Sequence, residues 1–285
     1  MYQSMVPIGR VARAEEMASA ALFLASDQSS YMTGADLMKL RKKRTTVIWS
    51  AVLALAPLLI FFIVRAAQHS SNPTEFAPAG GIHGFTDGMR LLAAVFAPLM
   101  AILVGAEAGA GDAASGVFRD LVVTGRSRIA LFSSRVPAAV ALTWAIATVG
   151  YLLLLIGTLA FASGASTPSG SQFLDGYGFT LLSTGVVCGL AVGFGSLTTS
   201  RPATLVVLIG WDLIASPILA SIKSLGSVRK LLFSQAVVHF SPVNFGEGPR
   251  GMEVTMSAAT AILVLAVWLV LFIGLGAWRT RTMDA

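Results

Sequence analysis

Six apolar runs, each close to 20 residues long, are the feature that most constrains how this chain can fold. A run of this length crosses the hydrocarbon core of a bilayer as an α-helix, because a helix satisfies its own backbone polar groups in lipid. The chain is 55% hydrophobic and only 12% charged, about half the charged fraction of a soluble protein. The sequence therefore predicts an all-α integral membrane protein with six transmembrane helices, at about residues 47–64, 89–106, 136–161, 178–197, 203–220 and 258–278.

The positive charge of the chain, +6 overall, is unevenly distributed among the connecting segments. Residues 38–46, 107–135, 198–202 and the C-terminal residues together hold twelve Lys and Arg, and the alternate set of segments holds six. Cytoplasmic loops of membrane proteins are enriched in Lys and Arg. We therefore expect a multi-pass protein of the cell (inner or plasma) membrane with both termini in the cytoplasm. The same bias accounts for the charge without a nucleic-acid partner.

Residues 1–37 have a soluble, amphipathic pattern unlike the rest of the chain. They carry a P-x-G-R-x-x-x-x-E-E run from Pro7 to Glu16, an F-L-A-S-D helix end and an S-x-x-x-T-G turn. These motifs closely resemble the C-terminal end of short-chain dehydrogenases. That family's glycine-rich phosphate loop and Tyr-x-x-x-Lys pair do not occur here, which argues against an oxidoreductase. We interpret residues 1–37 as a fusion relic, as sequence upstream of a true start at Met38, or as a small docking segment.

Residues 37–44, L-M-K-L-R-K-K-R, are basic and apolar on one side. This pattern is typical of an amphipathic entry helix that lies at the cytoplasmic interface beside anionic lipid. A plain topology signal explains the same residues equally well.

The segment from Glu107 to Arg135 is charged and broken by glycines. Its middle, residues 116–121, has the pattern of a short amphipathic helix, and residues 124–128 form a basic turn before the third run. A polar link of this kind must lie at the water surface, because unpaired backbone is costly in lipid.

From about residue 35 to the end, the chain resembles permease subunits of ABC-2 type ABC transporters. The motifs that carry the resemblance lie in this loop and in the entry helix. The resembling motifs are A-D-L-M-K-L-R-K-K-R, Gly105-Ala106-Glu107, G-V-F-R-D-L at 116–121 and T-G-R-S-R at 124–128. The resemblance implies a six-span permease domain at 38–285 and an exporter that works as a homodimer or with a paired permease. It also implies that the 116–128 helix couples the permease to a separate ABC ATP-binding protein.

The coupling residues implied by the resemblance divide by their chemistry. Apolar side chains anchor in a pocket of the partner, and flanking charges pair with it and fix the register. They are Val117, Phe118, Arg119, Asp120, Leu121, Arg126 and Arg128. The simpler interpretation is that the arginines only obey the positive-inside rule. A non-transporting membrane scaffold or regulatory subunit would use the same contact without moving a substrate.

Catalytic, cofactor and metal motifs are absent from the sequence. It contains no G-x-x-x-x-G-K-[ST] loop, so ATP is not bound by that route, and His69, His83 and His239 lack metal-ligand spacing. The chain is thus not expected to be an enzyme, and ATP and Mg²⁺ are expected on the partner subunit.

Three features within the apolar part have open interpretations. Asp212, midway along the fifth run, is a polar group on a substrate path, a contact across a subunit interface, or a helix-to-helix hydrogen bond. Glycines repeat every four residues on the fourth run, which favours close helix packing over a transport pathway; they are Gly185, Gly189 and Gly193. Residues 221–255 are too long for a simple turn, and their apolar stretch at 231–238 is shorter than a span, which predicts an interfacial or re-entrant helix pair.

Overall fold

The computed structural model describes residues 27–114, 127–243 and 254–282, and every regular element in this part of the chain is helical. Two elements, η2 and η3, are π-helical, and η4 is a 3-10 helix. In chain order the elements are α2 (Asp27–Lys42), α3 (Arg44–Ser71), α4 (Gly81–Leu91), η2 (Leu92–Phe96), α5 (Ala97–Ala114), α7 (Arg128–Ala160), α8 (Gly170–Thr198), α9 (Arg201–Gly210), η3 (Trp211–Ala215), α10 (Ser216–Ser221), η4 (Lys223–Leu231), α11 (Phe233–Val238) and α12 (Ala258–Thr282).

Six of the described helices are long and apolar enough to cross a membrane, which confirms the predicted number of spans. Spans one, three, four and six are the single helices α3, α7, α8 and α12. Span two is built from α4, η2 and α5, and span five from α9, η3 and α10. The first helix covers 44–71 instead of 47–64, because helical hydrogen bonding continues through polar residues where the apolar run stops. The protein is a multi-pass membrane protein.

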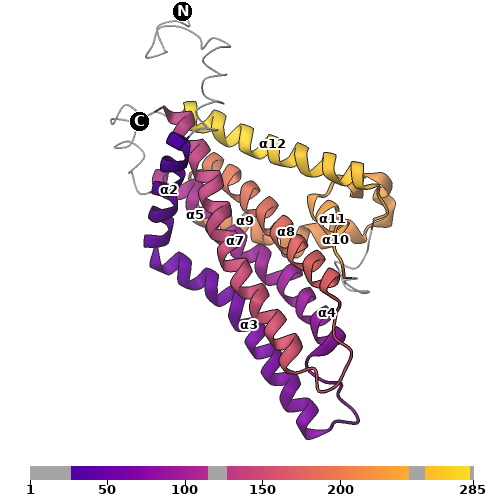
Figure 1. The fold of residues 1–285 in the computed structure, drawn as a ribbon. Helices are drawn as coiled ribbons and strands as arrows, with labels where there is room; N and C mark the ends of the chain where they lie inside the picture. Colours follow the sequence, from indigo (N-terminus) through magenta and orange to yellow (C-terminus); the bar gives the residue numbers. More distant parts are fainter. Residues whose placement is uncertain (1–26, 115–126, 244–253, 283–285) are drawn as a thin grey trace, which may run out of the picture.

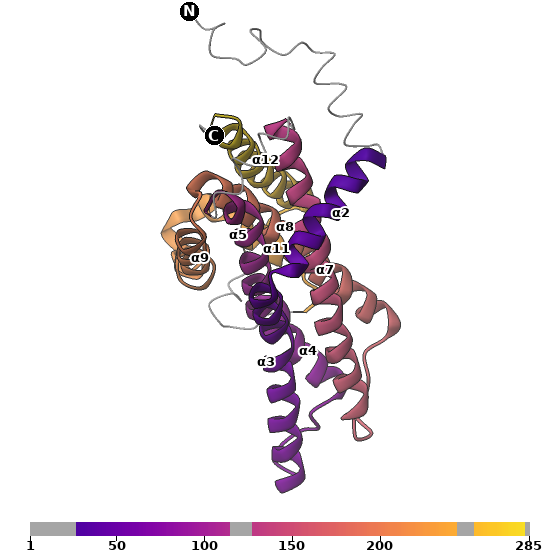
Figure 2. The ribbon, with the colours of Figure 1, turned by 90° about the vertical axis from the view of Figure 1, so that its left-hand side faces the viewer.

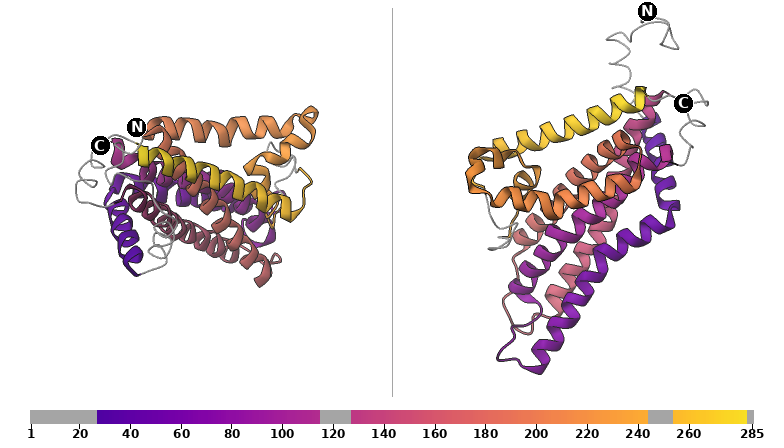
Figure 3. Two further views of the ribbon diagram at one scale, coloured as in Figure 1. Left: turned by 90° about the horizontal axis from the view of Figure 1, so that it is seen from above. Right: turned by 180° about the vertical axis from the view of Figure 1, so that it is seen from behind.

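The spans converge at one end of the molecule, where α2 lies, and separate toward the other (Figures 1 and 3). We call these the α2 end and the far end. Spans two and four are central, with 72% of their most apolar window buried, against 17–28% for spans one, five and six. The single-helix spans α7, α8 and α12 show little amphipathic pattern, so their apolar periodicity does not distinguish the central α8 from α12, which is mostly exposed.

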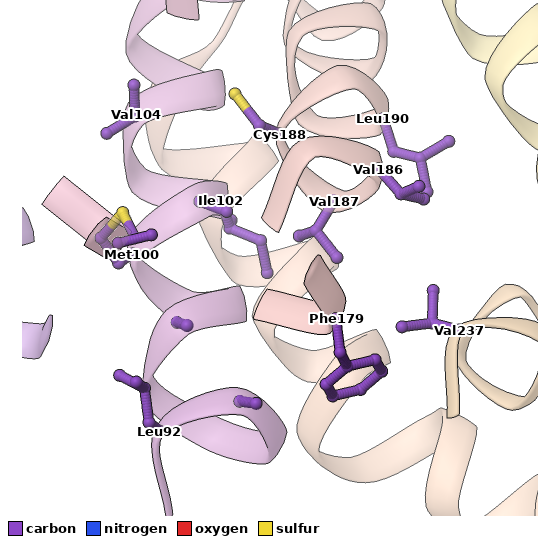
Figure 4. Close-up of a cluster of buried hydrophobic side chains, with 14 of the residues drawn as sticks. Leu92, Met100, Ile102, Val104, Phe179, Val186, Val187, Cys188, Leu190 and Val237 are labelled. Atoms are coloured by element: carbon purple, nitrogen blue, oxygen red, sulfur yellow. The ribbon is translucent and has the colours of Figure 1, made fainter. Parts of the chain in front are cut away.

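The most extensive contact between two helices is that of α5 with α8. A Cβ at Gly105 would lie 2.7 Å from the carbonyl oxygen of Cys188, and one at Gly109 would lie 2.4 Å from that of Val192. Small residues let membrane helices approach this closely. Further along the pair, Ile102 of α5 faces Val187 of α8 in the close-up of the buried core (Figure 4).

Both π-helical segments precede a proline. Pro98 follows η2 and Pro217 follows η3, so the residues four positions before them, Ala94 and Leu213, lie inside the π segments. A proline clashes with the carbonyl of residue i−4 and cannot donate to it. Widening the helix by one residue accommodates that clash. At Pro217 the helix therefore continues through a bulge without a break.

α2 begins ten residues earlier than the predicted entry helix and ends at Lys42, so that only Lys43 separates it from α3. It packs across α7, with Leu40 buried and Leu37 partly buried against the core, whereas Met38 is exposed (Figure 2). The predicted boundary between residues 37 and 38 thus falls inside one continuous helix.

Candidate functional site

Glu107, on α5 at the α2 end, is a buried carboxylate that binds two cations. Its side chain is 4% exposed, with Lys43 Nζ 3.0 Å from Oε1 and Arg201 Nη1 3.1 Å from Oε2. The Thr46 hydroxyl donates a hydrogen bond to Oε2 at 3.3 Å. A buried carboxylate is tolerated only when it is paired in this way. Glu107 therefore fastens span two to the starts of spans one and five.

Asp112 repeats the arrangement further along α5. Lys39 Nζ of α2 lies 3.1 Å from its Oδ2, and Arg135 Nη2 of α7 lies 3.0 Å from the same oxygen. The Arg135 side chain is only 5% exposed. On α2, Asp36 accepts a hydrogen bond from the Ser134 hydroxyl of α7 and lies 3.4 Å from Lys39. The carboxylate of Asp112 therefore joins the entry helix to spans two and three.

These residues form one group, which we call the ionic cluster. Four cations face three carboxylates, and the group connects α2, α5, α7 and α9 at the α2 end. The side chains of Lys39, Lys43 and Arg201 are partly exposed, so the cluster is only partly desolvated. Its members are Asp36, Lys39, Lys43, Glu107, Asp112, Arg135 and Arg201.

The ionic cluster flanks the predicted coupling loop. Asp112 precedes and Arg135 follows residues 115–126, which lie outside the described residues. Six of the predicted coupling residues fall in that segment: Val117, Phe118, Arg119, Asp120, Leu121 and Arg126.

The remaining coupling candidate, Arg128, begins α7. Its Nη1 donates to the backbone oxygen of Arg281 at 3.3 Å, and the side chain of Ser127 caps the helix by accepting from the Ala130 amide. The start of span three and the end of span six therefore lie together at the α2 end.

Asp212 is buried within the fifth span, on η3, with 4% of its surface exposed. It lines two cavities, and Val187 and Phe233 belong to the walls of both. One is small, about 30 Å³, and the other is about 190 Å³. The structure thus brings Asp212 into a site shared by span four, span five and α11.

The small cavity is lined by polar groups from four elements, η3, α8, α10 and α11. Besides Asp212 it has Ser183 of α8, Ser216 of α10, and Ser234 and Gln235 of α11. The Ser216 and Ser234 hydroxyls hydrogen-bond to each other, and Ser183 donates to the carbonyl of Thr180. Both π-helical segments contribute to its wall, η2 through Ala93 and Ala94. The small cavity is therefore where the two bulges meet.

The Gln235 side-chain oxygen lies inside this wall without a hydrogen-bond partner among the described residues. Gln235 itself is 5% exposed. An orphaned buried acceptor is uncommon and costs about 1–3 kcal/mol. It is therefore a feature that calls for a functional explanation.

The larger cavity is almost wholly apolar and aromatic. The Trp268 ring stacks on Phe272 with centroids 5.5 Å apart, and its centroid is 6.4 Å from that of Trp211. Trp268 Nε1 donates to the carbonyl oxygen of Leu231 at 2.7 Å, which fixes the indole. The rest of the wall is Ile102, Val187, Leu190, Phe194, Val207, Leu208, Asp212 and Phe233.

The three glycines singled out on span four contact two different neighbours. A Cβ at Gly185 would lie 3.1 Å from Trp144 Nε1 of α7. At Gly189 it would meet the Leu269 side chain at 3.0 Å, and at Gly193 the carbonyl oxygen of Phe272 at 2.4 Å, both on α12. These glycines lie against helices, and none of them lines the cavities around Asp212.

Sequence reasoning overlooked Gln235 and the aromatic wall. Gln235 lies within the short apolar stretch 231–238, and in the sequence Trp268 and Phe272 resemble any lipid-facing aromatic residue of a span. The available signal was the amide itself, because a polar side chain is costly in a short apolar segment of a membrane protein and therefore indicates a structural or functional role.

Comparison with known proteins adds two family matches. Residues 59–285 match the family described as Protein of unknown function (DUF2705). Residues 1–39 match the family described as Enoyl-(Acyl carrier protein) reductase, over the stretch that resembles short-chain dehydrogenases. No curated protein and no solved structure matches the chain. No ABC-2 permease family is matched, so that resemblance rests on the motifs quoted above.

Proposed function

The chain belongs to the DUF2705 family of proteins of unknown function, and we propose that it is the membrane-spanning permease subunit of an ATP-driven transporter. In this proposal a separate ABC ATP-binding protein holds ATP and Mg²⁺, and residues 116–128 form the coupling helix that contacts it. The transporter is an exporter in the cell membrane, and the permease acts as a homodimer or beside a paired permease.

The observation that carries the proposal is the ionic cluster on both sides of residues 115–126. A displacement of that segment acts on α5 next to Asp112 and on α7 near Arg135. From there Lys39 connects it to α2, and Glu107 connects it to Arg201 of span five. Helices that are packed together and joined by ion pairs move as rigid bodies, so that a shift of one is passed to the others. The cluster is thus suited to pass motion from one loop to four spans.

The position of the chain ends agrees with the proposed topology. α2 and the last described turn of α12 lie at the same end of the molecule (Figure 1), as six spans require. The basic residues of the entry helix and the ionic cluster gather at that end, which the positive-inside rule assigns to the cytoplasm. Exposed Arg41 and Lys42 on α2 are then placed to meet anionic lipid.

Transport is favoured over a scaffold role by the site around Asp212. A scaffold needs only packed helices and a partner surface. A buried carboxylate beside an orphaned amide oxygen and two cavities is costly to keep within a span. A substrate path gives these groups a use.

The experiment that tests the proposal is a pull-down of the tagged chain in mild detergent. We expect the wild-type chain to recover an ATPase that carries a Walker motif, and Phe118→Ala/Arg126→Glu to lose it. The matched control is Arg41→Glu, an exposed charge reversal on α2, which should leave recovery unchanged. Absence of any such ATPase, with and without nucleotide, would contradict the permease assignment. Equal loss with the control would show that general surface charge, and not the loop, makes the contact.

A further inference from the structure

The small cavity presents one unused hydrogen-bond acceptor and one unused donor. The Gln235 Oε1 atom has no hydrogen-bond partner among the described residues, and Gln235 is only 5% exposed. The hydroxyls of Ser216 and Ser234 hydrogen-bond to each other. One of them donates in that bond, so the other keeps its own proton to donate. The polar wall is therefore matched by a group that both donates and accepts.

A hydroxyl group meets this requirement. It donates one hydrogen bond and accepts others, so it serves the amide of Gln235 and the serine proton at the same time. An ammonium only donates, and a carboxylate or an ether only accepts. The volume of about 30 Å³ holds a group the size of one water molecule. Asp212 borders the cavity but has an interaction of its own, and this recognition does not depend on its charge.

The aromatic cavity adjoins the small one, because Val187, Asp212 and Phe233 border both. Its volume of about 190 Å³ exceeds the roughly 150 Å³ of an apolar cavity that binds benzene. The indole of Trp268 already donates to the carbonyl oxygen of Leu231, so it has no donor left for a ligand. The part of a ligand that this cavity accepts is therefore compact and apolar.

We propose that the site binds a neutral alcohol, with its hydroxyl between Gln235 and the serine pair and a compact ring or alkyl body in the aromatic cavity. A hydrocarbon or a lipid tail fills the aromatic side and leaves both polar groups unsatisfied. A water molecule satisfies the polar side alone, and the ligand's hydroxyl then adds nothing to binding. As the substrate class of the transporter, this inference rests on the function proposed above, whereas the binding itself needs no partner subunit.

The test is a calorimetric titration of the full chain in nanodiscs of phosphatidylcholine, with empty nanodiscs as the background. The ligand is 2-phenylethanol. Three probes of similar size test its hydroxyl: ethylbenzene has no polar group, 2-phenylethyl methyl ether accepts but does not donate, and 2-phenylethylamine is charged at pH 7. We expect the alcohol to bind about fivefold more tightly than the ether, and more tightly than the amine. Equal binding of alcohol and ether, or tighter binding of the amine, would overturn the proposal.

The Gln235→Met variant locates the hydroxyl. The affinity for the alcohol divided by that for ethylbenzene is compared between variant and wild type, which cancels the partitioning of each probe into lipid. We expect this ratio to fall about fivefold in Gln235→Met. The control is Gln68→Met, an exposed glutamine of span one, which should leave the ratio unchanged. An unchanged ratio in the folded Gln235→Met protein would overturn the proposal.

The serine pair gives a second prediction. Either Ser216→Ala or Ser234→Ala alone leaves one hydroxyl with a proton to donate, so the ratio should hold. The double variant should lower it about fivefold, and a full loss in either single variant would contradict the donor assigned to the pair. Trp268→Ala should weaken both probes, whereas Trp278→Ala, a tryptophan that is 60% exposed on the same span, should affect neither. Unchanged binding by the folded Trp268→Ala protein would contradict the placement of the apolar body.

The outcomes separate this inference from the permease assignment. If Gln235→Met does not fold, the comparison of alcohol, ether and amine on the wild-type chain still decides. Alcohol binding without recovery of an ATPase would support the site and contradict the transporter. Recovery of an ATPase without preference for the alcohol would support the transporter and remove this substrate class.

Discussion

Replacing Glu107 with glutamine tests whether the ionic cluster stabilises the α2 end. The substitution preserves the shape of the side chain and removes its charge. Lys43 at 3.0 Å and Arg201 at 3.1 Å then face an amide, and Thr46 keeps an acceptor. The perturbation is therefore electrostatic and leaves the packing of α5 intact.

The magnitude follows from how much of each partner is buried. Breaking a fully buried ion pair costs about 3–5 kcal/mol, because a charge is left without compensation. Here the carboxylate is 4% exposed, but Lys43 is 52% and Arg201 34% exposed, so both cations regain solvation. We expect a loss of about 2 kcal/mol. For a chain of this size that loss lowers the apparent Tm by about 4 °C.

The assay uses the single cysteine of the chain. Cys188 is fully buried on span four, so a thiol-reactive dye becomes fluorescent only when the bundle opens. Heating wild type and Glu107→Gln in the same detergent at the same scan rate gives the shift directly. The fixed scan rate matters because unfolding of membrane proteins is often irreversible.

The matched control is Asp87→Asn at the far end. Asp87 also faces two arginines, Arg65 and Arg90, but its side chain is 31% exposed. Exposed pairs contribute about 0–1 kcal/mol, so we expect a shift of at most about 2 °C. Equal shifts for the two variants would refute the argument from burial. No shift for Glu107→Gln would show that the ionic cluster contributes nothing to stability.

Three further predictions use the same dye assay. Gly109→Ala should lower the Tm by several degrees, because its Cβ would lie 2.4 Å from a carbonyl oxygen of α8, whereas Gly210→Ala, with nothing within 4 Å, should be neutral or slightly stabilising. Lys39→Glu should lower the Tm, because it places a carboxylate beside those of the ionic cluster, and Arg41→Glu on the exposed side of α2 should not. Cys188 should resist maleimide in the folded chain and react once it is denatured; rapid labelling without denaturant would contradict its burial.

The six spans were predictable because the signal for a transmembrane helix is local. Each run of apolar residues is sufficient by itself, whatever the rest of the chain does. The order of burial was not predicted from hydropathy, because spans one and two are both apolar enough to cross a membrane although only the second is central. The available signal was the high Ala and Gly content of α5, which permits close packing. The π-helical segments had a local signal in Pro98 and Pro217, but whether a proline bends, breaks or widens a helix depends on its neighbours.

The candidate sites were harder to predict because their members are far apart in sequence. Glu107 and Thr46 are separated by 61 residues, and Arg201 and Thr46 by 155. Nothing local indicates that a basic residue after span four pairs with an acid at the end of span two. Asp212 was recognisable by its charge within a span, whereas Gln235 acquires meaning only through the cavity that it lines.

The ionic cluster and the Asp212 site are linked by two helical spans. Span two carries Glu107 at the α2 end and lines the small cavity through Ala94. Span five likewise carries Arg201 at the α2 end and lines the small cavity through Asp212. At 1.5 Å per residue the two sites lie about 15–20 Å apart along each helix. On the proposed function, a push that rotates these helices at their paired ends changes the cavity where their π-helical bulges meet. Because α5 packs closely against α8 and span five is less buried, we expect the side of the cavity formed by span five and α11 to move more than the side formed by α5 and α8. A single rigid pair and a less buried partner helix are thus enough to convert loop movement into a change of the site.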